Sequence, residues 1–206
     1  WFNANKSLYT QSHEEVLSFV ASLMERMKEH DQIIEVSVKK VLFRIYRDIR
    51  FSKDKTPYKN YFAGRFQRDT QWLRGGYYFR IMPGESFMAA GFWNPNTQDI
   101  KRIREHIAAE PERIQKIADD QSLQEAFGTI AREKLKRIPR GFDKDHPAAE
   151  WLKHKQFIVT KEFSDEEVTS ANFPDLINNY YKKVRPFFNY MSEILTTDLN
   201  GEPIYE

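Results

Sequence analysis

The sequence predicts one α+β domain over residues 1–206, with a mainly antiparallel sheet packed against helices and a helix-rich second half. Residues 61–93 hold short runs of β-branched and aromatic residues separated by turn residues, which is typical of an antiparallel meander. Residues 97–131 instead carry apolar residues at helical spacing. No repeat, low-complexity tract or flexible linker interrupts this order, so we expect a single unit.

The first predicted elements are a helix, two strands and a long loop. Ser12 followed by Glu15 matches a capping box, and apolar residues at helical spacing then predict a helix to residue 27. Residues 33–38 and 41–46 are rich in β-branched and aromatic residues, which favours two strands. Residues 47–59 show no clean period and contain a proline, so we expect a long connection held in place by its contacts.

The remaining elements follow from turn, cap and periodicity signals. Pro83-Gly84-Glu85 joins two of the strands, Pro111 and Pro147 each precede or begin a helix, and Pro186 is expected to kink the last helix. In chain order we predict strands at 61–66, 76–82 and 86–93, helices at 97–109, 112–119 and 123–131, an irregular stretch at 135–142, a helix at 148–154, a strand at 156–163 and a helix at 173–195.

The composition, 40% hydrophobic and 30% charged, is that of a globular protein. No apolar run approaches the roughly 20 residues that span a bilayer, so we expect no membrane span. The absence of cysteine excludes disulfides and thiolate sites, and makes the cytosol the expected compartment. The chain begins at Trp1 without a methionine or a signal-peptide pattern, so we expect a short native leader to be missing before it.

The net charge of +2 conceals a strong local asymmetry. Residues 39–68 contain ten basic and two acidic residues, about +8, and the rest of the chain carries about −6. We call residues 44–59 the cationic segment. Its candidate ligand-binding residues are Arg44, Arg47, Arg50, Lys53, Lys55, Tyr58 and Lys59.

The cationic segment permits three interpretations. Arginine forks and lysine ammonium groups suit carboxylates and phosphates, so a cleft that binds a small anionic or phosphorylated ligand is the leading hypothesis. Alternatively, Arg47 and Arg50 pair with Asp48 and Asp54 and brace the loop. A nucleic-acid or protein docking surface is the third possibility, although the small net charge argues against nucleic acid.

A second constellation of titratable residues lies near residue 150. Its members are Asp143, Asp145, His146, Glu150 and His154. His146 with Asp143 or Asp145 would supply the acid and base of a hydrolase or transferase. In the simpler interpretation the two aspartates shape a turn and His146 caps a helix, since Pro147 suits the first helical position. The spacing is not a known metal pattern, so we predict no metal site, and no nucleotide or cofactor motif appears.

Several blocks of the sequence resemble an uncharacterised family, domain of unknown function 2461. The most specific block is Phe43-Arg44-Ile45-Tyr46-Arg47-Asp48-Ile49-Arg50-Phe51-Ser52-Lys53-Asp54-Lys55-Thr56-Pro57-Tyr58-Lys59. Others are Trp1-Phe2 with Asn5-Lys6, Gly76-Tyr77-Tyr78, Lys134-Leu135-Lys136-Arg137, and residues 141–147 with Lys155 and Phe157. The resemblance implies a nearly complete member of that family, and it implies no reaction, substrate or cofactor. Ala89-Ala90-Gly91 departs from the glycine-rich run expected there.

Overall fold

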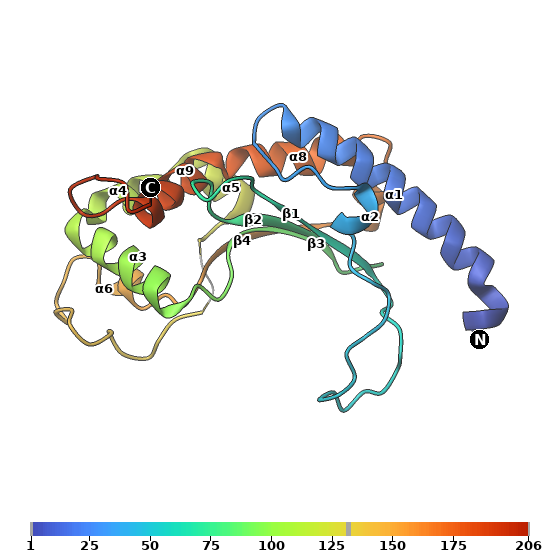
Figure 1. The fold of residues 1–206 in the computed structure, drawn as a ribbon, viewed down its shortest axis with the longest axis horizontal. Coiled ribbons are helices and arrows are strands. Elements are labelled where there is room, and N and C mark those ends of the chain that lie inside the picture. The colour runs from blue at the N-terminus through green and yellow to red at the C-terminus, as the bar shows by residue number, and fades with distance from the viewer. Residues whose placement is uncertain (1, 131–132, 206) are drawn as a thin grey trace.

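The computed structural model describes residues 2–130 and 133–205, and it places helices along one face of a four-stranded sheet (Figure 1). The strands are β1 (Phe62–Gln67), β2 (Gly76–Ile81), β3 (Ser86–Phe92) and β4 (Phe157–Phe163). The helices are η1 (Phe2–Asn5), α1 (Lys6–Lys28), α2 (Val38–Val41), α3 (Thr97–Ala109), α4 (Pro111–Ala118), α5 (Gln121–Phe127), α6 (Ala149–Leu152), α7 (Asp165–Thr169), α8 (Phe173–Lys183) and α9 (Arg185–Thr196). The fold is therefore α+β.

The sheet is an antiparallel meander in the order β1-β2-β3-β4. The expected turn between β2 and β3 forms because Gly84 adopts a φ of +71°, a conformation that costs glycine little. The Ser86 hydroxyl closes this turn by donating to the Met82 carbonyl at 2.9 Å. The three meander strands predicted from the sequence, and the fourth at residues 156–163, are confirmed to within one residue at each end.

The core lies between the sheet and the helices α1, α8 and α9, which cover the upper face in Figure 1. Tyr77 of β2 meets the rings of Tyr181 and Phe188 edge-on, at centroid distances of 4.7 and 5.0 Å. All three side chains are buried, and each such burial contributes about 1.5–3 kcal/mol to stability. Helices α1 and α8 lie side by side, joined by the bidentate pair of Arg26 and Asp175.

The start predicted for the first helix is wrong. Helix α1 begins at Lys6, six residues before Ser12, and Ser12 lies inside it. The additional turns are held by tertiary contacts, since the ring of Tyr9 stacks on Phe62 at 5.9 Å. These contacts extend the helix past a local cap signal, whose effect is typically about 1 kcal/mol.

The two strands predicted at 33–38 and 41–46 are also wrong. The chain follows the edge of β1 but touches it at separate points, through the backbone bonds Ile34 N to Gln67 O and Phe43 N to Ala63 O, both 2.9 Å. The single helical turn of α2 lies between these points and breaks the register, so no continuous ladder forms.

The helical second half follows the prediction closely. Helix α3 has the predicted bounds, because the Asn96 side chain caps it by accepting from the Asp99 amide at 2.8 Å. Helix α5 ends at Phe127 and is followed by Gly128, and the predicted end at Ala131 lies outside the described residues. The predicted kink near Pro186 is a break at Val184 between α8 and α9. Among the described residues, no helix joins the length and the apolar character that a bilayer crossing needs.

Candidate functional site

The two faces of the sheet have different surroundings. The upper face is buried under helices, whereas Figure 1 shows no helix beneath the centre of the lower face. Because side chains alternate along a strand, residues next to the buried Tyr77 and Phe79 point to the lower face. The register places four of these residues in one row across the sheet: Arg65, Tyr78, Ala89 and Thr160.

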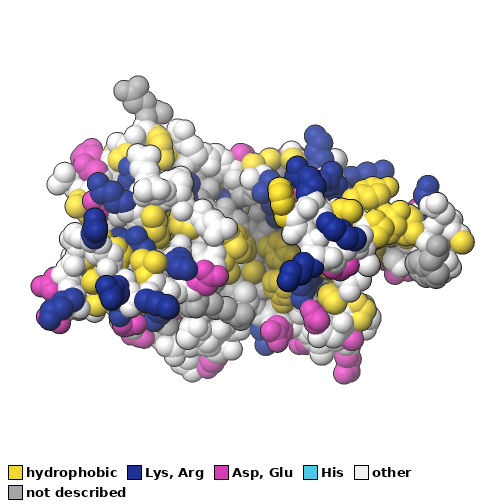
Figure 2. Space-filling view, turned by 90° about the horizontal axis from the view of Figure 1, so that it is seen from below, with side chains coloured by type: hydrophobic (Ala, Val, Ile, Leu, Met, Phe, Trp, Pro, Cys, Tyr) yellow, Lys and Arg dark blue, Asp and Glu magenta, His cyan; other side chains and the backbone are white. Residues whose placement is uncertain are grey.

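A groove crosses this lower face, and we call it the sheet groove. Two hollows of about 670 and 310 Å³ make it up, and both have Tyr78 and Trp93 in their walls. Figure 2 shows this face from below, with hydrophobic side chains in the depression between two lobes. The other lining residues with a role below are Phe43, Arg65, Arg74, Phe87 and Asp99. The dimensions are those of a small-molecule site.

Aromatic rings form much of the groove floor. Tyr78 is half-buried at its centre, with the rings of Phe43 and Phe87 at centroid distances of 6.2 and 5.5 Å. Trp93 remains 41% exposed at one side. Burial raises the pKa of the Tyr78 hydroxyl, and nearby Tyr61 acts in the same direction. At neutral pH the floor therefore offers flat apolar surfaces and one uncharged hydroxyl.

Arg65 is a cation in register with Tyr78, the central ring of this aromatic floor. It lies directly across from Tyr78 in the β1–β2 ladder, so their Cβ atoms are about 5 Å apart. Its side chain is exposed and makes no ion pair or hydrogen bond with any described residue. The planar guanidinium therefore has its full set of donors free for a ligand.

Arg74 lies at the α3 end of the groove and is already paired. Its Nη2 donates to the buried Asp99 carboxylate at 2.5 Å, and the Asn96 amide donates to the same carboxylate at 3.0 Å. Asp99 is fixed in turn by the helix cap that starts α3. The pair therefore closes one end of the groove and adds almost no net charge to it.

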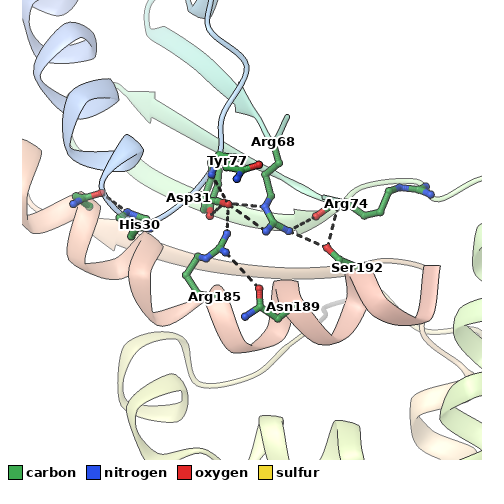
Figure 3. A network of polar contacts seen from close by, with 10 residues as sticks. His30, Asp31, Arg68, Arg74, Tyr77, Arg185, Asn189 and Ser192 are labelled. Atoms are coloured by element: carbon green, nitrogen blue, oxygen red, sulfur yellow. Dashed lines mark hydrogen bonds and ion pairs between the residues drawn. The ribbon is translucent and has the colours of Figure 1, made fainter. Parts of the chain in front are cut away.

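A buried cluster of polar side chains supports Arg74 from behind (Figure 3). Its centre is Asp31, whose carboxylate accepts from Arg68 at 2.8 and 3.2 Å and from the Tyr77 hydroxyl at 2.5 Å, and also pairs with Arg185. Arg68 also donates to the backbone carbonyl of Arg74 at 2.9 Å. We call Asp31, Arg68, Tyr77 and Arg185 the buried cluster. It links the chain just after α1 to the sheet and to α9, and it holds the chain that leads into the groove.

The cationic segment satisfies many of its charges internally. Arg50 pairs with Asp48 through bonds of 2.9 and 2.7 Å, and Arg47 pairs with Asp54. The hydrogen bond from Arg47 lowers the pKa of Asp54 to about 2. This is the geometry of the self-pairing interpretation.

The other predicted residues of this segment divide into two groups. Lys55 and Lys59 donate to the carbonyls of Ile49 and Arg44 at 2.9 and 2.7 Å. Arg44 and Lys53 are exposed and make no ion pair with a described residue. Tyr58 turns inward and stacks on Phe2 at a centroid distance of 4.3 Å. The segment is thus a braced loop, and its inner side faces a different cavity from the sheet groove.

The residues near position 150 occupy structural positions. Asp143 accepts from the Asp145 amide at 3.0 Å, and His146 Nδ1 accepts from the Ala148 amide at 3.0 Å, as in a turn and a helix start. Glu150 pairs with Lys134 and Lys153, and these bonds lower its pKa to about 2. His154 is buried, its Nδ1 at 3.1 Å from the Trp151 carbonyl, and burial lowers its pKa.

These residues and the cationic segment are not brought together. The loop that contains His146 hangs below one end of the sheet, and the cationic segment hangs below the other (Figure 1). Within residues 2–130 and 133–205, no group of three or more His, Asp or Glu side chains is arranged to hold a metal ion.

The family comparison agrees with the blocks noted in the sequence. A family described as "Conserved hypothetical protein (DUF2461)" matches residues 1–190. The chain belongs to this family. No curated protein and no solved structure gives a match.

No sequence pattern predicted a site at the sheet groove, although Phe43 and Tyr78 lie in blocks that resemble the family. Arg74, Trp93 and Asp99 belong to no sequence motif. One signal in the sequence does indicate this face. Alternation in β2 places Tyr78 and Arg80 on the face of the sheet opposite to the buried Tyr77 and Phe79. Aromatic residues on both faces of a central strand indicate that the second face is lined for contact as well.

Proposed function

We propose that the protein binds a small anionic ligand with a planar part, in the cytosol, and that the sheet groove is the binding site. The observation that carries this proposal is the unpaired Arg65 beside the aromatic floor around Tyr78. A guanidinium recognises carboxylate or phosphate through two parallel hydrogen bonds. Rings next to it provide a surface on which a planar group stacks. Together they match a ligand with both features.

The ion pairs of the cationic segment make it a poorer anion site than the sheet groove. Arg47 and Arg50 would have to leave Asp54 and Asp48 before binding an anion, which reduces any gain. Arg65 has no such partner to lose. We do not extend the proposal to catalysis, because Asp143 and His146 already accept backbone hydrogen bonds in a turn.

Binding of AMP, UMP, benzoate and inorganic phosphate, followed by calorimetry and thermal shift, tests the proposal. We expect AMP or UMP to bind more tightly than phosphate, and Arg65→Gln to weaken that binding about tenfold or more, since a charged hydrogen bond is lost. Lys53→Gln is the matched control, because it removes another exposed and unpaired cation, one that lies outside the groove.

Two results would count against the proposal. One is that none of the four probes binds the unmodified protein. The other is that Arg65→Gln and Lys53→Gln weaken binding equally, which would indicate attraction by overall charge. If a short single-stranded RNA binds with strong salt dependence and the mononucleotides do not, the groove is a nucleic-acid surface and the small-ligand proposal fails.

A further inference from the structure

A second cavity lies on the other side of Phe43, and we call it the apolar hollow. It is enclosed by the first turns of α1, the inner side of residues 43–62 and the end of β2, and its volume is about 850 Å³. Phe43 contributes to the walls of both the apolar hollow and the sheet groove. The other lining residues of the two cavities differ, so the apolar hollow is a separate site and a ligand there does not depend on the proposed function.

The walls of the apolar hollow are mostly hydrocarbon. Phe2 stacks on Tyr58 and packs against Tyr9, at centroid distances of 4.3 and 5.5 Å, so these rings form one continuous wall. Leu8, on the first turn of α1, is 57% exposed, and Phe43 is 43% exposed. Large apolar side chains grouped around a cavity leave water in contact with hydrocarbon, which an apolar ligand would relieve.

Lys59 is the only basic side chain in this lining among the described residues. Its Nζ donates to the Arg44 carbonyl at 2.7 Å and lies 5.8 Å from the centre of the Phe43 ring. An ammonium group has three donors, and this contact uses one of them. The Lys59 side chain is half-buried, and this burial, together with the charge of Arg44, lowers the pKa of its ammonium group.

The one acidic side chain in the described lining is on a different element. Glu15 projects from α1, and its described contact is the Gln11 amide at 3.4 Å, with no ion pair to Lys59. The apolar hollow thus joins a long hydrocarbon surface to a single cation that has donors to spare. Nucleic acid does not suit this lining, because its backbone carries a charge at every residue.

We propose that the apolar hollow binds a single-chain amphiphile, an unbranched alkyl carboxylate, with its carboxylate on Lys59 and its tail along the wall formed by Phe2, Leu8 and Tyr9. The carboxylate takes the free donors of Lys59 as a charge-assisted pair. The tail replaces water against the exposed apolar side chains. Tyr58 and Lys59, two of the ligand-binding residues predicted from the sequence, would then act on the inner side of the cationic segment.

Calorimetry with a chain-length series of alkyl carboxylates tests this proposal. Octanoate, decanoate and dodecanoate are titrated below the concentrations at which they form micelles. Burial of each added CH₂ is expected to lower the Kd about fourfold. A flat series, or no binding of dodecanoate, would overturn the proposal.

Variants locate the site and separate it from the sheet groove. Lys59→Met keeps an apolar stem but loses the charge, so it should weaken dodecanoate about tenfold and leave the neutral analogue dodecanol unchanged. Lys55→Met is the matched control, because Lys55 also donates to a backbone carbonyl of the same segment, at 2.9 Å, but lies outside the hollow. Arg65→Gln should have no effect on dodecanoate.

Leu8→Glu is a second variant that tests the site independently if Lys59→Met does not fold. Leu8→Glu changes an exposed position on the first turns of α1, so folding should be preserved while a negative charge enters the hollow. It should weaken dodecanoate at least tenfold. Unchanged binding in both Lys59→Met and Leu8→Glu, or weaker binding in Arg65→Gln, would place the amphiphile elsewhere and refute the proposal.

Discussion

The cationic segment and the buried cluster use the same chemistry, arginine paired with aspartate, in opposite environments. Arg50 and Asp48 have side chains that are 77% and 48% exposed, whereas the values for Arg68 and Asp31 are 0% and 1%. Exposed pairs gain little, because water solvates both charges whether or not they meet. A buried pair is different, because removing one partner leaves a charge stranded without solvent. Similar contacts in the two regions therefore have very different energetic consequences.

Asp31→Asn should have the largest effect. The substitution leaves Arg68 with no carboxylate in the interior and weakens the anchor of Arg185, so the expected loss of unfolding free energy is about 3–5 kcal/mol. Urea denaturation measures it, with Asp48→Asn as the exposed counterpart. Similar stabilities for the two variants would abolish the distinction between the regions.

Tyr77→Phe tests how much of the buried cluster depends on its neutral member. The variant keeps the ring in the core but removes the hydroxyl that donates to Asp31 at 2.5 Å. Hydrogen bonds to charged groups contribute about 1.5–3 kcal/mol, so the loss should be smaller than for Asp31→Asn. A denaturation series on both variants gives the comparison, and a larger loss for Tyr77→Phe would show that the ion pairs are not the dominant contribution.

Asp54→Asn should have the smallest effect at neutral pH, with a Tm within about 2 °C of the unmodified protein. The effect of Asp54→Asn on stability should also depend on pH. The pKa of Asp54 is depressed to about 2 in the folded protein, against about 3.9 in an unfolded chain. The carboxylate therefore stabilises the fold above pH 4, and this contribution is lost as the pH falls towards 2. Thermal melts from pH 7 to pH 2 should show the two proteins converging, and a constant difference would contradict this.

The sequence predicted the elements whose signals are local. The meander strands follow from alternation and from the turn at Gly84, and α3 follows from apolar spacing with a cap at Asn96. The prediction of two strands within residues 33–46 was wrong because β-branched composition favours extended backbone but does not specify a partner strand. The predicted start of α1 at Ser12 was wrong because ring contacts between Tyr9 and Phe62 extend the helix towards the N-terminus.

The candidate site was harder to predict because it is formed by distant segments. In the buried cluster that supports Arg74 of the groove, Asp31 and Arg68 are 37 residues apart, and neither position carries a motif that marks burial. The basic residues of positions 39–68 look alike in sequence, yet Arg68 is buried, Arg47 is paired at the surface and Arg65 is free. The strand register and the placement of α9 determine whether each arginine is buried, paired or free. Neither can be predicted from local patterns in a single sequence.

The packing of α1 against α8 also sets an order on synthesis. Arg26 and Asp175 are 149 residues apart in the chain, and His30 contacts Asn178 across a similar separation, at 2.8 Å. A ribosome adds about 5–20 residues per second, so the first helix waits roughly 8–30 s before its partner exists. During that interval the apolar side of α1, with Val20, Leu23 and Met27, has no native cover from α8. The nascent chain therefore keeps this apolar side without its native partner until the last helices emerge.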